Sequence, residues 1–136
     1  MSEAGLVRGV VLAHGSMASG LVDAVRRISG VDGEALVPLT NDGKSPDTVR
    51  NELEELLGKA PTIVFTDLPS GSCAVSARFC CRDSGEEAVV FGVNLPVLLD
   101  FVFHRDLPLS ELVPRLLEKG REGLSSAPEY SRPPST

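Results

Sequence analysis

Basic side chains are scarce in this 136-residue sequence, which has 13 Lys and Arg against 19 Asp and Glu and a net charge of −6. Such a chain has no positive field to attract a polyphosphate backbone, so we predict no nucleic acid partner. Long apolar runs are also missing: none approaches the roughly 20 residues that a membrane-spanning helix needs. The first residues lack the basic, apolar and small-residue segments of a secretory leader, which favours a cytoplasmic protein without membrane insertion.

Cysteine and tryptophan contribute little to the sequence, which has three cysteines (Cys73, Cys80 and Cys81) and no tryptophan. The cysteines are odd in number and lack the paired C-x-x-C spacing of a zinc site, so we predict reduced thiols in apolar surroundings and no metal centre. The absence of tryptophan removes one usual anchor of a protein interface. The hydrophobic content of 42% and the length are those of a single folded domain.

Short β-branched apolar runs alternate with stretches of helical periodicity. The predicted strands are 6–13, 35–39, 61–66 and 88–93. The first helix is predicted from a cap at Ser16 to Gly30, with Val22, Val25 and Ile28 on its inner face. Further helices are predicted at 47–57, 72–82, from 94 onward and at 108–122. We predict one domain over 1–125 and a Ser/Pro-rich tail over 126–136, which has too little apolar matter to fold.

This alternation predicts an α/β fold, a mostly parallel sheet of four or five strands with helices on both faces. In such sheets, reactive groups gather beyond the carboxyl ends of the strands, where loops meet the starts of helices. His14, Asp67 and Asn94 follow the first, third and fourth predicted strands. The topology can therefore bring them to one crevice, although Asn94 is equally typical of a turn or a helix cap.

His14 lies between a buried strand and the start of a helix, followed by Gly15 and Ser16. Gly15 permits a tight backbone path, and the free amides at the helix start can bind anionic oxygens. Imidazole is nucleophilic near neutral pH, so this position suits an attack on phosphorus. The alternative is a hydrogen-bonded loop histidine without chemistry, which is the commoner role. His104, after an apolar helix, is interpreted as a surface residue.

Asp67 and the segment Ser70-Gly71-Ser72 follow the third predicted strand. An Asp67 carboxylate that accepts a hydrogen bond from one ring nitrogen of His14 leaves the other nitrogen free to attack. Hydroxyls and backbone amides of the serine-glycine turn offer a second group of donors for phosphate oxygens. Asp67, Ser70 or Ser72 can equally serve as helix caps, so the alternatives remain open at this point.

Four segments in order along the chain resemble the IIA component of the mannose-type phosphoenolpyruvate-dependent sugar phosphotransferase system. They are GVVLAHGS (9–16), FTDLPSGS (65–72), GVNLP (92–96) and EKGREG (118–123). The likeness runs from about Leu6 to Leu124. It departs from many relatives after the aspartate, where an aromatic residue, two glycines, Ser and Pro are replaced by Leu68 through Cys73.

The resemblance implies a flavodoxin-like sheet and a phosphotransferase without a cofactor. By this likeness, His14 receives a phosphoryl group from the histidine-containing phosphocarrier protein and passes it to a IIB component, for sugar uptake or regulation. Asp67 would bond one nitrogen of His14, with Gly15, Ser16, Gly71 and Ser72 holding the phosphate. Family members commonly form homodimers, some by exchanging an edge strand.

Other classes compete with this interpretation. The IIA-like phosphoryl donor subunit of dihydroxyacetone kinase shares the implied fold and chemistry, but its histidine motif usually lacks the glycine found here at position 15. A non-catalytic anion-binding module would bind phosphate in the same crevice without a covalent adduct. An α/β-hydrolase is disfavoured because the chain lacks a G-x-S-x-G elbow.

Overall fold

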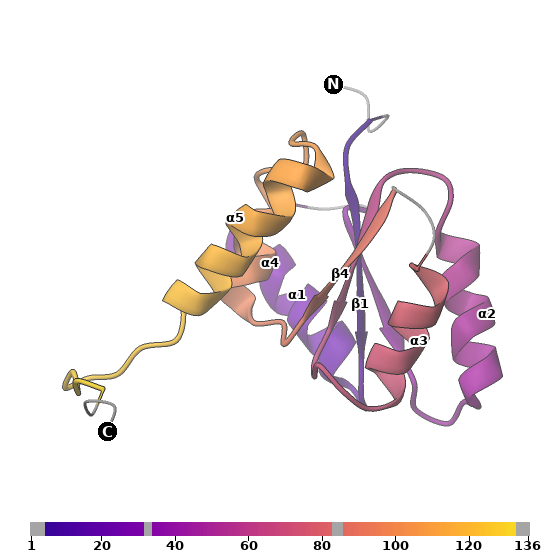
Figure 1. The fold of residues 1–136 in the computed structure, drawn as a ribbon, viewed down its shortest axis with the longest axis horizontal. Helices are drawn as coiled ribbons and strands as arrows, with labels where there is room; N and C mark the ends of the chain where they lie inside the picture. Colours follow the sequence, from indigo (N-terminus) through magenta and orange to yellow (C-terminus); the bar gives the residue numbers. More distant parts are fainter. Residues whose placement is uncertain (1–4, 32–33, 83–85, 133–136) are drawn as a thin grey trace.

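The computed structural model describes residues 5–31, 34–82 and 86–132. Strands and helices alternate along the described chain (Figure 1). The strands are β1 (Arg8–Ala13), β2 (Leu36–Thr40), β3 (Thr62–Thr66) and β4 (Glu87–Phe91). The helices are α1 (Met17–Ser29), α2 (Pro46–Leu56), α3 (Ser72–Cys80), α4 (Leu95–Val102) and α5 (Leu109–Glu122).

The strands form one sheet in the order β2-β1-β3-β4, and the pairings β1 with β2, β1 with β3 and β3 with β4 are all parallel. Leu12 of β1 pairs with Leu39 of β2 on one side and with Thr66 of β3 on the other. The α/β architecture predicted from the sequence is confirmed. The described part of the chain contains four strands, the lower of the two numbers expected.

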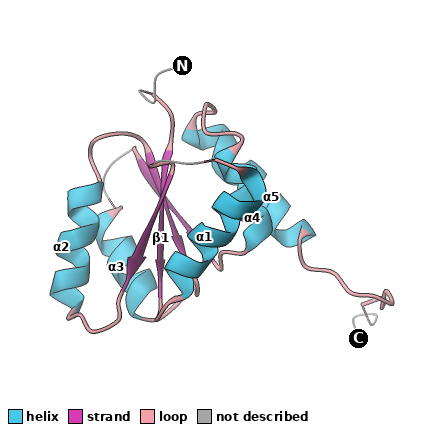
Figure 2. Ribbon diagram, turned by 180° about the vertical axis from the view of Figure 1, so that it is seen from behind, coloured by secondary structure: helices cyan, strands magenta, loops and turns pink. Residues whose placement is uncertain are grey.

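Helices cover both faces of the sheet, α1, α4 and α5 on one and α2 and α3 on the other (Figures 1 and 2). Alternate residues of β1 serve the two layers, since Val11 and Ala13 pack with the first group of helices and Val10 and Leu12 with the second. Strands that are buried on both faces have continuous apolar sequences, and this pattern allows β1 and β3 to be predicted from the sequence.

The first helix differs in detail from its prediction. Gly30 ends α1 in the left-handed conformation, as its position predicts, with φ +73°. Ile28 is 62% exposed and does not belong to the buried face, which consists of Ala18, Val22 and Val25. Ser16 occupies the N-cap position, but its side chain makes no capping hydrogen bond because its backbone lies outside the extended region that capping needs.

Residues 123–132 contain no helix or strand in the structure, and they leave the body of the protein after α5 (Figure 1). Leu124 and Tyr130 are 87% and 78% exposed, so this segment adds little to the core. No helix within the described ranges combines the length and apolar character needed to cross a membrane.

Candidate functional site

The sheet topology places the ends of β1 and β3 side by side. The helix after β1 packs on one face of the sheet and the helix after β3 on the other, so the chain diverges between these two strands. In open α/β sheets this divergence creates a crevice at the carboxyl ends of the strands. His14 directly follows β1 and Asp67 directly follows β3. Because Leu12 pairs with Thr66 in the register of the two strands, His14 and Asp67 emerge at the same height of the sheet.

His14 and Asp67 make two hydrogen bonds to each other. The backbone N–H of His14 donates to Oδ2 of Asp67 at 3.0 Å, and ring atom Nδ1 lies 2.7 Å from the same oxygen. The other carboxylate oxygen accepts the backbone N–H of Leu68 at 3.0 Å. The Asp67 side chain is 9% exposed and that of His14 is 44% exposed. A largely buried carboxylate therefore orients a ring whose other edge meets solvent.

The hydrogen bonds keep Asp67 ionised. Burial acts to raise the pKa of its carboxyl, but the two hydrogen bonds from His14 and the charge of that ring outweigh it, so the pKa lies below its ordinary value of 3.8. The ionised carboxylate accepts the hydrogen bond, so whenever the ring is neutral its single N–H lies on Nδ1. The lone pair of the imidazole is then on Nε2, the nitrogen that faces away from Asp67.

Both glycines predicted to bind phosphate adopt left-handed backbone, Gly15 with φ +58° and Gly71 with φ +92°. A Cβ on Gly71 would come 3.9 Å from Cε1 of His14, so this turn lies against the ring. Ser16 and Gly71 immediately precede α1 and α3, whose first N–H groups have no partner inside the helix. The start of α3, with its positive dipole end, therefore lies beside the imidazole, and the start of α1 follows His14 in the chain.

The last residue of β2 and the first residue after it hold both turns by hydrogen bonds. The hydroxyl of Thr40 donates to the carbonyl of Gly15 at 2.7 Å, and the side-chain amide of Asn41 donates to the hydroxyl of Ser72 at 3.2 Å. Neither Thr40 nor Asn41 was singled out in the sequence, because their role depends on β2 lying next to β1. The Ser72 hydroxyl, expected to face phosphate, accepts this bond from Asn41 and keeps its own O–H as a donor.

Cys73 is the group that sequence reasoning missed at this site. Its sulfur lies 3.8 Å from Nδ1 of His14, and the residue is only 1% exposed. Burial, and then the nearby Asp67 carboxylate, raise the pKa of the thiol to about 11. The sulfur is thus protonated and unreactive at neutral pH. Spacing between cysteines could not reveal a thiol whose neighbours are a histidine and an aspartate.

Asn94 does not reach this site. Its side-chain oxygen accepts the backbone N–H of Val97 at 3.0 Å, and its amide donates to the carbonyl of Gly120 at 3.0 Å. It caps α4 and ties that helix to α5, which confirms the cap interpretation and corrects the expectation of a shared crevice. Ser70 likewise makes no hydrogen bond to His14 in the described part of the structure.

We expect Asn94→Ala to lower the free energy of unfolding by about 1–2 kcal/mol, because a cap bond and a link between helices are lost together. Chemical denaturation measures this loss. Asn94→Asp retains the cap acceptor but not the donor to Gly120, and so separates the two contributions. The NMR signals of the His14 ring should be unchanged in both variants; a shift of those signals would contradict the placement of Asn94 outside the site.

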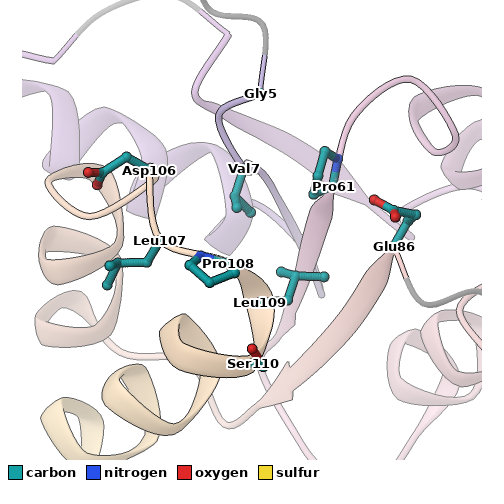
Figure 3. A pocket seen from close by; sticks show the side chains of 9 residues that line it. All are labelled: Gly5, Val7, Pro61, Glu86, Asp106, Leu107, Pro108, Leu109 and Ser110. Carbon is teal, nitrogen blue, oxygen red and sulfur yellow. The ribbon is translucent and has the colours of Figure 1, made fainter.

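Two hollows lie at opposite ends of the sheet. One, of about 400 Å³, is lined by Gly15, Ser16, Thr40 and Asp42 together with parts of β2 and α1, beside the His14 turn. The other, of about 470 Å³, lies at the amino ends of the strands, where Val7, Pro61 and Glu86 precede β1, β3 and β4 (Figure 3). This second hollow is therefore remote from His14 and Asp67, which follow the carboxyl ends of β1 and β3.

Comparison with known proteins identifies the family of this chain. Residues 9–115 match the model of the family described as PTS system fructose IIA component. The chain belongs to this family. It is a IIA component, a phosphocarrier of a sugar phosphotransferase system, and the resemblance noted in the sequence is confirmed.

Solved IIA structures share the fold. The phosphotransferase system component EIIA from Streptococcus agalactiae is 22% identical with a TM-score of 0.83, over 90% of this chain and 98% of its own. The mannose/sorbose specific IIA subunit from Enterococcus faecalis is 21% identical with a TM-score of 0.79, over 96% and 99%. The IIA protein associated with the fucose utilization operon of Streptococcus pneumoniae is 23% identical with a TM-score of 0.74, over 91% and 95%. Among curated proteins, none matches the chain.

Proposed function

We propose that this IIA component accepts a phosphoryl group on Nε2 of His14 from the histidine-containing phosphocarrier protein and donates it to a IIB component. The observation that carries the proposal is the 2.7 Å contact between Nδ1 of His14 and the Asp67 carboxylate, combined with a ring that is 44% exposed. One nitrogen is held by the protein, and the other is open to a partner.

The transfer is a displacement at phosphorus. The Nε2 lone pair forms a new N–P bond while the N–P bond of the donor phosphohistidine breaks, and the donor nitrogen keeps the electron pair of the broken bond. The His14 ring becomes positively charged, with its Nδ1 proton shared with Asp67. The carboxylate therefore stabilises the charge that develops during the step. Transfer to the IIB component reverses the same sequence of bonds.

Backbone amides would hold the phosphoryl oxygens. The start of α3 at Gly71 lies against the ring, and α1 starts at Met17, three residues after His14. The N–H of Met17 donates to the carbonyl of His14, so the amides that follow it in α1 would have to supply donors. Phosphoryl transfer depends chiefly on such positioning and charge stabilisation. Gly15 and Gly71 allow the backbone to approach closely, and the Ser72 hydroxyl, which accepts a hydrogen bond from Asn41, keeps its own O–H to donate to a phosphoryl oxygen.

Exposed apolar side chains near His14 provide a docking surface for the two protein partners. Met17 begins α1 and is 42% exposed, Leu68 follows Asp67 and is 52% exposed, and Val75 in the first turns of α3 is 54% exposed. The sequence has no tryptophan to anchor an interface, and these side chains provide apolar contact area in its place.

The proposal includes a cytoplasmic homodimer serving sugar uptake or regulation. Within the described residues, β4 pairs with β3 on one side only, so its outer edge is available to a second copy. Light scattering of the full chain tests this assembly independently of phosphorylation.

The test of the function is incubation of the protein with phosphoenolpyruvate, enzyme I and the phosphocarrier protein, followed by intact mass spectrometry before and after mild acid. We expect the mass of one phosphoryl group to be gained and then lost in acid, as for a phosphohistidine. Nitrogen NMR should assign the adduct to Nε2. Omission of the phosphocarrier protein is the control. An unmodified protein, or an acid-stable adduct, contradicts the proposal.

A further inference from the structure

Three metal-binding side chains converge on one point at the end of the sheet. One donor atom each from His14, Asp67 and Cys73 lies within 4.8 Å of the other two. They come from three segments: the residue after β1, the residue after β3 and the first turn of α3. We propose that these side chains bind a zinc ion, and that zinc and the phosphoryl group exclude each other from His14.

The donor set suits zinc, which binds imidazole, thiolate and carboxylate in tetrahedral geometry. Typical Zn–N and Zn–S bonds of about 2.0 and 2.3 Å put tetrahedral nitrogen and sulfur ligands about 3.6 Å apart. The Nδ1 of His14 and the sulfur of Cys73 are already separated by 3.8 Å. The 2.7 Å contact from Nδ1 to Asp67 must lengthen to about 3.3 Å as metal replaces the shared proton.

The charges of these side chains agree with this assignment. A carboxylate and a thiolate together balance the charge of one zinc ion, and the thiolate of Cys73 would lie in the first turn of α3, where the helix dipole favours an anion. With three protein ligands, the fourth position is left for water, as in open zinc sites.

The exclusion follows from the chemistry of imidazole and rests on the proposed function. When Asp67 accepts the Nδ1 proton, the lone pair is on Nε2 and can attack phosphorus. When zinc takes the lone pair of Nδ1, the neutral ring must carry its proton on Nε2, which then has no lone pair to donate. Binding releases the thiol proton, and the ring proton moves from Nδ1 to Nε2. One ring therefore holds either zinc or phosphorus.

The direct test uses the full chain with Cys80→Ser and Cys81→Ser, which leaves Cys73 as the single thiol. Zinc is titrated against a chromogenic chelator, and cobalt(II) replaces zinc for spectroscopy. We expect one zinc per chain and a thiolate-to-cobalt charge-transfer band. Cys73→Ser in this background should weaken zinc binding at least about tenfold and abolish the band. His14→Ala, which alters an exposed side chain, should weaken binding similarly even if the cysteine variant folds poorly.

Phosphorylation assays separate this inference from the proposed function. Phosphorylation in the presence of a strong chelator tests the phosphocarrier alone, and zinc titration needs no phosphate. We expect zinc to inhibit phosphorylation of the Cys80→Ser, Cys81→Ser protein, with the inhibition constant rising in Cys73→Ser by the same factor as the dissociation constant. Equal zinc affinity with and without the Cys73 thiol and the His14 ring, or a cobalt complex without the thiolate band, overturns the zinc site. Phosphorylation unaffected by zinc when the site is full overturns the exclusion.

Discussion

His14→Ala is expected to abolish the acid-labile phosphoryl adduct completely while the protein remains folded. In the proposed function the imidazole of His14 supplies the attacking lone pair. The other histidine, His104, also has a carboxylate beside Nδ1, but the distance to Oδ1 of Asp100 is 3.4 Å, against 2.7 Å from His14 to Asp67, and Asp100 is bonded by Arg115. The side chain is 44% exposed, so its removal opens no cavity in the core. Intact mass spectrometry after incubation with the phosphoryl donors measures the adduct, and thermal unfolding reports the fold.

The matched control is His104→Ala, since the chain has only two histidines. His104 follows α4, and its Nδ1 lies 2.8 Å from the carbonyl of Asp100. The neighbouring Arg105 is tied to Val7 at the amino end of β1, the opposite end from His14. His104→Ala should be phosphorylated like the wild type. An adduct that survives in His14→Ala and disappears in His104→Ala would place the phosphoryl group on His104 and contradict the proposed role of His14.

Asp67→Asn should slow phosphoryl transfer by about 10²–10⁴-fold. Asparagine keeps the size of the side chain but removes the negative charge that stabilises the developing positive ring, and its amide no longer ensures that the proton stays on Nδ1. Rapid-quench measurement of adduct formation, at saturating donor, gives the rate. Asp23→Asn is the control, because Asp23 is exposed and pairs with Arg27 on the surface of α1. Equal rates in Asp67→Asn and the wild type would remove Asp67 from the mechanism.

The same variant has a second readout in acid. The folded-state pKa of Asp67 lies below its ordinary value of 3.8, so the charged carboxylate stabilises the fold at pH values above 3.8. That contribution is lost as the pH falls through the folded-state pKa. The difference in unfolding free energy between the wild type and Asp67→Asn should therefore shrink as the pH is lowered below 3.8.

The sequence was sufficient to predict the parts of the site that follow from strand order. His14 and Asp67 each follow a buried apolar run, and parallel strands bring such positions to one edge regardless of how the helices pack. Asn94 also follows a strand, but it comes three residues after the end of β4, and it bonds Gly120 instead. The difference arises because β4 is separated from β1 by β3, a fact that local patterns do not encode.

Tertiary packing decided what the sequence could not predict. Ile28 fits the helical period of α1 but lies near the end of the helix, where no neighbouring element covers it, and it remains exposed. Cys73 looked like a simple apolar filler, and it is indeed buried. Its contact with His14 depends on the rotation of α3 about its own axis, which the small residues of that helix do not reveal.

The double attachment of His14 to Asp67 has a kinetic consequence. Because the backbone and the ring of His14 are both bonded to the same carboxylate oxygen, the ring keeps one orientation, and a single nitrogen meets solvent from one direction. Under the proposed function, the phosphoryl donor and acceptor would therefore use the same nitrogen in turn, and we expect no ternary complex. Steady-state rates should give parallel double-reciprocal lines, with each unphosphorylated partner acting as a competitor of the other.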